Sequence, residues 1–403
     1  MIRSDAEFDL ALVFISYGSV FRDIAEGLAK KGLKVLVLAP DREYKNPDNA
    51  YPSQQASENL WVERISVPRL DKNRLLHKLV FFLFFSHRSA AFLKKFEAKL
   101  FVSSLMPVLV PYEVFKISRT KNAPFILLLE DLIPDTWIRR KRFSKNNPIV
   151  RFFGRQTRIL MDESDKIIVI GRDMQDYIQR AYGVTPERIE FIPNWAKLAE
   201  QETHNKGTER KEAPFVVLYG GTIGEAQNLV PLIHAAEIVM KTDRGIEFQI
   251  IGSGMRQKEL QKIAADRGIT NVRFFDLQPT EDYARSMDRA SLMVVSLREE
   301  SKGMSVPSKT YSCLAQSKPI LAIVPGGSEI HMEIKEDGYG IFCPPESPKE
   351  IAEAIIKIKN DKALYAECAR NAFNAHKLKY NDKVALGKYF EVVKDVLERK
   401  AGS

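Results

Sequence analysis

Two glycine-rich stretches in the second half of the sequence have the composition of anion-binding loops. The first reads YGGTIGEAQN (219–228) and the second IGSGM (251–255), and each follows an apolar run. Glycines such as Gly221 and Gly252 let the backbone approach a phosphate closely, and the N-terminus of a following helix favours negative charge. Each loop could also be a simple tight turn. Two such loops at successive strand ends predict a site for a nucleotide diphosphate.

Other anion and metal motifs do not fit the sequence. Neither loop matches G-x-G-x-x-G, which argues against an NAD enzyme, and no phosphate-binding G-x-x-x-x-G-K-[ST] is present. Cys313, Cys343 and Cys368 are odd in number and scattered, which argues against a disulfide framework or zinc site and fits a reducing cytoplasm. His77 and His87 lack metal-ligand spacing with the other histidines. We therefore expect no metal and no cofactor.

A pair of carboxylates ends an apolar run in the first half, in the segment EDLIP (130–134). If residues 123–131 form a buried strand, Asp131 lies at its carboxyl end, where it could align an acceptor hydroxyl or accept its proton. A helix cap is an equally simple role for such a carboxylate. Glu130 and Asp135 are the fallback candidates.

Strand and helix patterns alternate through the first half. An apolar run at 9–16, an amphipathic stretch at 19–32 and a second apolar run at 33–40 have the spacing of a βαβ unit. Further buried strands are expected at 123–131 and 165–171, with a helix at 146–164 between them. Gly18 follows the first strand, where it could approach a bound ligand or serve only as a turn.

The second half repeats this alternation after a polar stretch. Residues 197–214 show no apolar period and read as an interdomain linker. We therefore predict an N-terminal Rossmann-like domain at 1–196, a second one at 215–380, and a C-terminal helix at 381–403 that packs back on the first. In doubly wound sheets, ligands bind at the carboxyl ends of the strands.

The net charge of +9 is concentrated in one stretch. Between Trp61 and Leu160 there are 20 Lys and Arg against 7 Asp and Glu. Within this stretch, residues 69–101 mix basic side chains with a dense aromatic and aliphatic block. Such a segment can lie in an anionic membrane interface or form a buried helix with solvated flanking charges. Nucleic acid is a weaker option, because no recognised binding motif accompanies the charge.

Membrane insertion is not expected from the sequence. The first ten residues lack the apolar region of a signal peptide. The longest apolar runs, at 79–85 and 125–129, are too short to span a bilayer. We expect a cytoplasmic protein, soluble or bound to a membrane surface.

Residues 190–345 resemble the nucleotide-binding domain of glycosyltransferase family 4. The resemblance rests on RIEFIPNW, VVLYGGTIGEAQNL, FQIIGSGMRQKEL, NVRFFDLQP and VPSKTYSCLAQSKPILA, in that order. The PSK-x-Y-x-x-LA element followed by KPI is similar to the subgroup that builds bacterial cell-surface polysaccharides, and EDLIP resembles an element of its first domain. The resemblance implies a GT-B fold, with two Rossmann-like doubly wound domains facing across a cleft, and a retaining, metal-independent reaction.

Several departures from the family pattern fall on binding positions. The family's two glutamates are replaced by Met304 and Ser312, and its Arg and Lys in the first glycine loop by Thr222 and Gln227. Lys309 is then the best candidate for the missing cation, with Arg298, Lys302 and Arg256 in reserve. The resemblance implies this set of donor-binding residues: Gly18, Gly221, Thr222, Gly252, Gly254, Arg256, Asp276, Leu277, Gln278, Ser308, Lys309 and Ser312. Asp131 and Lys309 are the catalytic candidates.

The sequence thus predicts a retaining glycosyltransferase that uses a UDP-sugar, with an N-acetylated hexosamine or deoxyhexosamine as the expected sugar. The expected acceptor is a glycan or an undecaprenyl diphosphate-linked sugar in O-antigen or capsule synthesis, which would bring the enzyme to the anionic inner face of the plasma membrane. A UDP-N-acetylhexosamine epimerase of the same architecture and a non-catalytic scaffold of polysaccharide assembly are the alternatives.

Overall fold

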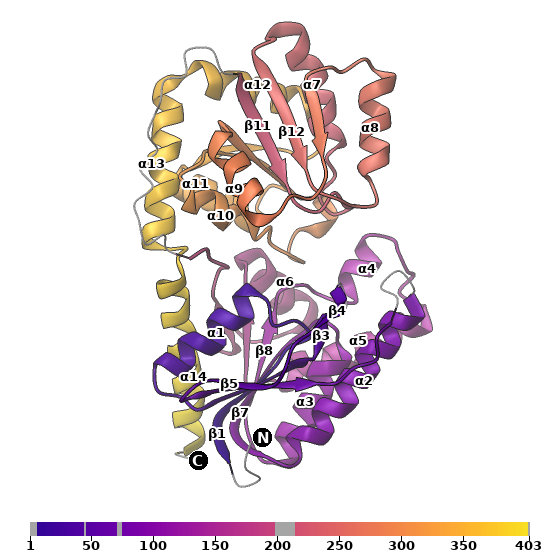
Figure 1. Ribbon diagram of the computed structural model, residues 1–403, viewed down its shortest axis with the longest axis vertical. Helices are drawn as coiled ribbons and strands as arrows, with labels where there is room; N and C mark the ends of the chain where they lie inside the picture. The colour runs from indigo at the N-terminus through magenta and orange to yellow at the C-terminus, as the bar shows by residue number, and fades with distance from the viewer. Residues whose placement is uncertain (1–5, 44–45, 71–74, 198–213, 402–403) are drawn as a thin grey trace. The chain divides into compact units, whose positions relative to one another are not determined.

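The computed structural model describes residues 6–43, 46–70, 75–197 and 214–401. The chain forms two compact units. Unit 1 comprises Met1–Pro193 together with Ala385–Ser403, and unit 2 comprises Asn194–Val384 (Figure 1). Nearly all of the predicted linker at 197–214 lies outside the described residues. Each unit is an α/β domain built on a largely parallel sheet, so the predicted fold class is confirmed.

Unit 1 is built on an eight-stranded sheet with the order β10-β9-β8-β7-β1-β2-β6-β5. All neighbours are parallel except β5 and β6. The strands are β1 (Glu7–Val13), β2 (Val35–Pro40), β5 (Gln54–Ser57), β6 (Leu60–Ile65), β7 (Glu97–Ser104), β8 (Phe125–Leu129), β9 (Lys166–Val169) and β10 (Ile189–Phe191), and β3 (Arg42–Glu43) pairs separately with β4 (Asn46–Ala50).

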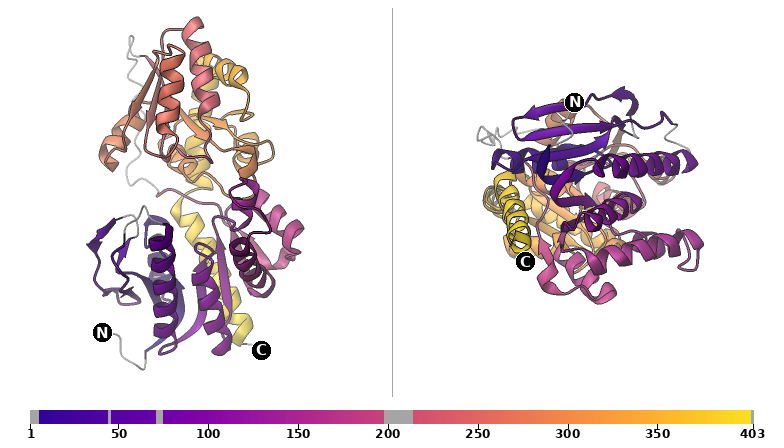
Figure 2. Two further views of the ribbon diagram at one scale, coloured as in Figure 1. Left: turned by 90° about the vertical axis from the view of Figure 1, so that its right-hand side faces the viewer. Right: turned by 90° about the horizontal axis from the view of Figure 1, so that it is seen from below.

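Helices cover both faces of this sheet. The chain moves in one direction through β6, β7, β8 and β9, so right-handed crossovers place the intervening helices on one face. These are α2 (Leu75–Leu93), α3 (Leu109–Thr120) and α5 (Pro148–Glu163), which lie side by side in Figure 2. The other face carries α1 (Ser19–Lys30) and α14 (Asp382–Ala401), where the Lys31 ammonium lies 4.6 Å from the Phe390 ring centroid.

Unit 2 contains a six-stranded parallel sheet with the order β13-β12-β11-β14-β15-β16. The strands are β11 (Phe215–Gly220), β12 (Ile246–Ile251), β13 (Val272–Phe275), β14 (Leu292–Ser296), β15 (Ile320–Ile323) and β16 (Gly340–Cys343). The chain leaves β11 toward β12 and β13 and then returns to the opposite side of β11 as β14. The order of the strands therefore reverses at β11 and β14, and ligands bind beside such a reversal.

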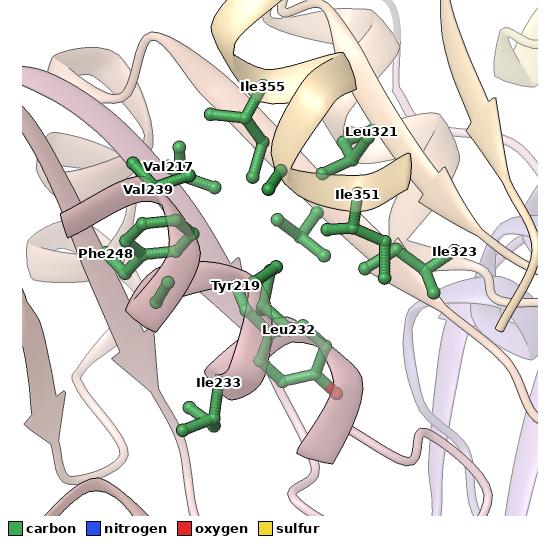
Figure 3. Close-up of a cluster of buried hydrophobic side chains, with 14 of the residues drawn as sticks. Val217, Tyr219, Leu232, Ile233, Val239, Phe248, Leu321, Ile323, Ile351 and Ile355 are labelled. Carbon is green, nitrogen blue, oxygen red and sulfur yellow. The ribbon is translucent and has the colours of Figure 1, made fainter. Parts of the chain in front are cut away.

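The core of unit 2 is apolar on both sides of its sheet. The helices that cover the sheet are α7 (Val230–Thr242), α8 (Gln257–Asp266), α9 (Thr280–Arg289), α10 (Lys309–Ala315), α11 (Glu329–Asp337), α12 (Pro348–Asn360) and α13 (Lys362–Leu378). Figure 3 shows side chains of α7 and α12, such as Leu232 and Ile351, pointing toward Tyr219 and Leu321 of the strands. All five residues of β14 are buried, as expected for a parallel strand with helices on both faces.

One predicted boundary in unit 2 is wrong. The segment AQNLVPLIHAAEIVMK (226–241) predicts a helix that starts at Ala226, but α7 begins at Val230. Pro231 fits the first turn of a helix because its missing N–H would have no partner there, and Asn228 has a φ of 34°, which interrupts a helical backbone. The first glycine loop therefore runs from Gly221 to Leu229, between β11 and α7.

Candidate nucleotide-sugar site

Two glycine loops lie together at the carboxyl ends of β11 and β12. The Gly221 N–H donates to the Ile251 carbonyl at 2.9 Å, and the Ile223 N–H donates to the Ser253 carbonyl at 2.9 Å. The Arg256 N–H returns a hydrogen bond to the Ile223 carbonyl at 3.2 Å. The loops after two neighbouring strands are therefore joined into one backbone surface at the edge where ligands bind.

The glycines of the second loop are needed for this contact. A Cβ on Gly252 would lie 1.9 Å from the Gly221 carbonyl oxygen, and one on Gly254 would lie 2.2 Å from the Ile223 carbonyl oxygen. Gly252 also has a φ of 151°, which a side chain disfavours. The glycine signal in the second loop is therefore explained by packing between loops. Whether Gly252 or Gly254 also contacts a donor remains a prediction.

We expect Gly252→Ala to lower the free energy of unfolding by about 3 kcal/mol, because the new Cβ must push the two loops apart and the backbone is strained. Urea unfolding measures the change, and the affinity for UDP should fall at least tenfold. Gly387→Ala is the matched control, since nothing lies within 4 Å of its added Cβ. Gly387 lies inside α14, so alanine should raise stability there by about 0.5–1 kcal/mol. Unchanged stability of Gly252→Ala would contradict the loop contact.

Lys309 is the first residue of α10 and brings a cation to these loops. Its Nζ is buried and has no hydrogen-bond partner among the described residues. It lies 3.6 Å from the centroid of the Tyr219 ring and 3.3 Å from the position that a Cβ on Gly221 would occupy. Burial lowers the pKa of Lys309 to about 7. An unsatisfied buried ammonium is costly, so this group is poised to gain an anionic partner.

The other predicted cations already have partners. The Arg256 guanidinium pairs with Glu259, and Arg298 lies 3.5 Å from Glu225 and 3.3 Å from Glu300. The Lys302 ammonium donates to the Gly326 carbonyl. Arg298 Nε is also buried without a hydrogen bond, but its guanidinium has the two ion pairs. Among the four candidates, Lys309 is the cation with neither a hydrogen bond nor an ion pair in the described part of the chain.

Two tyrosines lie beside the first glycine loop, and sequence reasoning missed both. Tyr219 is buried in β11, directly before Gly220, and its hydroxyl donates to the Thr222 carbonyl at 2.6 Å. Tyr283 of α9 fills the space above Gly220, where a Cβ would lie 2.1 Å from its hydroxyl oxygen. The aromatic residue directly before Gly-Gly was a usable signal for Tyr219, whereas Tyr283 is brought in only by the tertiary fold.

The remaining predicted donor residues are spread over the same edge of the sheet. Asp276, Leu277 and Gln278 follow β13; Asp276 accepts a 3.4 Å bond from Gln257, and Gln278 accepts one of 3.0 Å from Ser286. Leu277 is 70% exposed, which leaves an apolar side chain free to contact a ligand. Thr222, Ser308 and Ser312 are exposed.

The two positions where family 4 has glutamates differ in environment. Met304 is fully buried, so a side chain at this position belongs to the core of unit 2. Ser312 is exposed on α10, one helical turn from Lys309. The structure offers no carboxylate at either position.

In unit 1, two carboxylates follow β8. Burial and the Asp131 charge raise the pKa of Glu130 to about 7. Burial raises the pKa of Asp131 to about 6, although the Arg140 guanidinium opposes this shift. No side chain caps α4 (Asp135–Arg139), whose N-cap is Pro134, so Asp131 is not a helix cap. Carboxyl groups that titrate near neutrality are suited to proton transfer.

Two other predictions in unit 1 lose structural support. Asp135 accepts hydrogen bonds from the hydroxyls of Tyr177 at 2.7 Å and Tyr182 at 2.6 Å, which gives it a structural role. Gly18 precedes α1 with a φ of −79°, and a Cβ there would make only an ordinary 3.7 Å contact with Ser16. The backbone therefore does not require glycine at this position, and its contact with a ligand remains a prediction.

Within the described residues, no group of three or more His, Cys, Asp or Glu could hold a metal ion. The same part of the chain contains no helix with the length and hydropathy needed to cross a bilayer.

Comparison with known proteins decides the family. Residues 18–200 match the model described as Glycosyltransferase Family 4, and residues 200–375 match Glycosyl transferases group 1. The chain is a family 4 glycosyltransferase with the GT-B fold. The epimerase alternative is therefore not supported.

Two relatives of this family 4 glycosyltransferase align with different shares of the chain. A probable glycosyltransferase of Pseudomonas aeruginosa, WbjE, is 26% identical over 83% of this chain and 84% of its own length. The putative colanic acid biosynthesis glycosyl transferase WcaI of Escherichia coli K12 is 28% identical, over 47% of this chain and 48% of its own.

Solved structures share the fold at low identity. Sucrose-phosphate synthase from Thermosynechococcus elongatus has a TM-score of 0.76 at 15% identity, covering 97% of this chain and 99% of that one. Anabaena HepE, solved in complex with UDP-glucose, has a TM-score of 0.66 at 16% identity, with 96% and 99% covered.

Proposed function

We propose that this family 4 glycosyltransferase takes a sugar from a UDP-sugar and transfers it with retention of anomeric configuration. An N-acetylated hexosamine or deoxyhexosamine is the sugar that the PSK-x-Y-x-x-LA element favours. The acceptor is a glycan or an undecaprenyl diphosphate-linked sugar of a cell-surface polysaccharide. The observation that carries the proposal is the buried ammonium of Lys309 beside Gly221 at the tip of β11, with no hydrogen-bond partner among the residues that the structure describes.

Departure of the nucleoside diphosphate is the step in which Lys309 would act. As the bond to the anomeric carbon breaks, negative charge develops on the leaving phosphate oxygen, and a fixed cation in a water-poor site stabilises that charge. The N–H of Gly221 already donates to Ile251, so this glycine contributes open space for the phosphate rather than a donor. Thr222 and Ser308 are exposed next to Gly221 and Lys309 and can supply hydroxyl donors.

Asp131 is the proposed acceptor-side residue. An acceptor hydroxyl loses its proton as it attacks, and a carboxylate near the end of a strand can align that hydroxyl or accept the proton. The raised pKa values of Glu130 and Asp131 support this role, because a carboxylate whose pKa lies closer to neutral pH is a stronger base.

The comparisons support the donor and pathway at a general level. HepE is solved with UDP-glucose, and WcaI is named for colanic acid biosynthesis, a polysaccharide pathway. On this basis we propose that the chain acts in bacterial polysaccharide biosynthesis. A lipid-linked acceptor would bring it to the inner face of the plasma membrane.

A thermal-shift screen across UDP-, GDP-, ADP- and dTDP-sugars tests the donor class. A ligand that binds only the folded state raises the unfolding midpoint by mass action, so UDP-sugars should do so at the lowest concentration. A shift with GDP-sugars alone would show that the donor carries guanosine rather than uridine. No shift with any nucleotide sugar would contradict the donor site and favour the scaffold alternative.

A further inference from the structure

One side of unit 1 carries an apolar surface on α2. The helix buries Phe81 and Phe85, so two of the aromatic residues that sequence suggested for a membrane contact belong to the core. The opposite side exposes Leu79, Val80, Leu83 and Phe84, the last to 49%. Single exposed apolar residues are ordinary, but four on successive turns of one helix form a continuous strip. This strip is the first part of the surface.

The turn between α4 and α5 supplies a second apolar part. Phe143 lies in the turn, and Ile149 and Phe152 lie on the first two turns of α5, both 54% exposed. Asn147 fixes the start of α5, since its side chain accepts from the Ile149 N–H at 2.9 Å. These residues are held by a capped helix end and are not a loose tail.

Both parts lie toward the same end of one helical layer. Helices α2, α3 and α5 each follow a parallel strand of the sheet, so their N-termini lie at its carboxyl edge. The strip occupies the first half of α2, and the second part occupies the start of α5. The exposed Met106 lies just before α3, the helix that contacts both α2 and α5. Glu130 and Asp131 leave β8 at this same edge.

Basic side chains dominate the two segments that carry the apolar residues. From Trp137 to Met161 there are eight Lys and Arg and no Asp or Glu, and α2 also contains no acidic residue. Lys141, Lys145, Arg151 and Arg155 are exposed and have no carboxylate partner within the described residues. Exposed aromatic and aliphatic side chains interleaved with unpaired cations suit the interface of an anionic bilayer, with cations at phosphates and rings below them.

We infer that the exposed face of α2 and the α4–α5 turn form one docking surface for an anionic lipid bilayer. Docking in this way places the carboxyl edge of the unit 1 sheet, with Glu130 and Asp131, beside the headgroups. A lipid-linked acceptor would then present its sugar at the membrane plane. The presentation of the acceptor rests on the proposed function. The contact with lipid does not depend on that function.

The test is flotation of the full chain with vesicles of neutral phosphatidylcholine, with and without phosphatidylglycerol. We expect binding to the anionic vesicles alone, weakening as salt rises. Phe84→Ser combined with Phe152→Ser should reduce binding at least tenfold. Lys141→Gln, Lys145→Gln and Arg151→Gln together should reduce it about a hundredfold, near fivefold for each charge. All these side chains are exposed, so thermal midpoints should stay unchanged.

Matched changes elsewhere serve as controls. Leu378→Ser removes an apolar side chain that is 68% exposed in unit 2, and Lys258→Gln with Lys262→Gln removes two exposed cations of α8. Neither should affect flotation. Absence of binding at low salt, or equal binding to neutral vesicles, would overturn the inference. The inference would also be overturned if the double serine variant floated like the wild type but lost a dimer on size exclusion. A second copy of the chain would then occupy the surface.

Calorimetry with UDP on the same preparations separates this inference from the proposed function. Variants that lose flotation should keep their affinity for UDP. If the wild-type chain floats but does not bind UDP, the docking surface stands and the donor assignment fails.

Discussion

Replacing Lys309 with methionine should abolish tight UDP binding and make the ligand-free protein more stable. The variant keeps the length of the side chain over Tyr219 but removes the ammonium beside Gly221. Loss of a desolvated charge that pairs with a diphosphate typically costs about 2–5 kcal/mol, so we expect UDP affinity to fall about 100- to 1,000-fold. Isothermal titration calorimetry measures this loss.

The gain in stability follows from the direction of the pKa shift. Burial lowers the pKa of Lys309 from 10.5 to about 7, so the unfolded chain binds a proton more readily than the folded chain. The ammonium therefore destabilises the empty protein fully below pH 7, and the penalty shrinks as pH rises toward 10.5. Lys309→Met should raise the free energy of unfolding by about 2–4 kcal/mol at pH 7, and by less at pH 9.

Donor binding should also take up a proton through Lys309. A diphosphate raises the pKa of a nearby ammonium, so at pH 8 the bound protein should hold close to one proton more than the free protein. Titrations in buffers of different ionisation enthalpy count that proton, and Lys309→Met should lose the uptake.

Lys302→Met is the control, because that ammonium already donates to Gly326 and should change UDP affinity less than fivefold. A larger loss with Lys302→Met than with Lys309→Met would contradict the assignment of the cation.

Replacing Asp131 with asparagine should lower kcat about 100- to 10,000-fold while leaving UDP affinity within a factor of two. General base catalysis contributes on this order, and asparagine preserves the size of the side chain. Asp131 is needed as a carboxylate, and its pKa is raised to about 6, so wild-type activity should fall as pH drops through 6. The residual activity of Asp131→Asn should not fall as the pH drops through 6.

The neighbouring Glu130→Gln is the matched control for this experiment. Both residues follow β8, and burial raises both pKa values, but Asp131 is the predicted acceptor-side group. We expect Glu130→Gln to lose less than tenfold in kcat. If it loses more activity than Asp131→Asn, the base is Glu130.

The fold could be predicted because its elements carry local signals. The runs at β8, β11 and β14 are apolar and start directly after Pro124, Pro214 and Ser291, and polar segments separate them. The start of α7 is harder to place, because Ala226 and Gln227 are compatible with a helix, although Pro231 signals its first turn. Its position depends on loop contacts that form only in the folded unit, such as the bond from Arg298 N–H to the Ala226 carbonyl at 2.9 Å.

The sequence predicts which residues belong to the candidate site, but it does not predict the contacts between them. Sequence reasoning identified Lys309 from a motif, yet the contacts that distinguish it from Arg256, Arg298 and Lys302 come from partners distant in sequence. The packing role of Gly252 likewise depends on a carbonyl 31 positions earlier. For α2, composition gave the right mixture of charge and aromatic residues. Which phenylalanines are buried was set by packing against α3.

A crystal structure of the protein with UDP tests the central claim most directly. We predict that an oxygen of the diphosphate lies within hydrogen-bond distance of Lys309 Nζ, in front of Gly221 and over the joined loops after β11 and β12. A diphosphate bound elsewhere, with the ammonium still lying over Tyr219 without a new partner, would contradict the account.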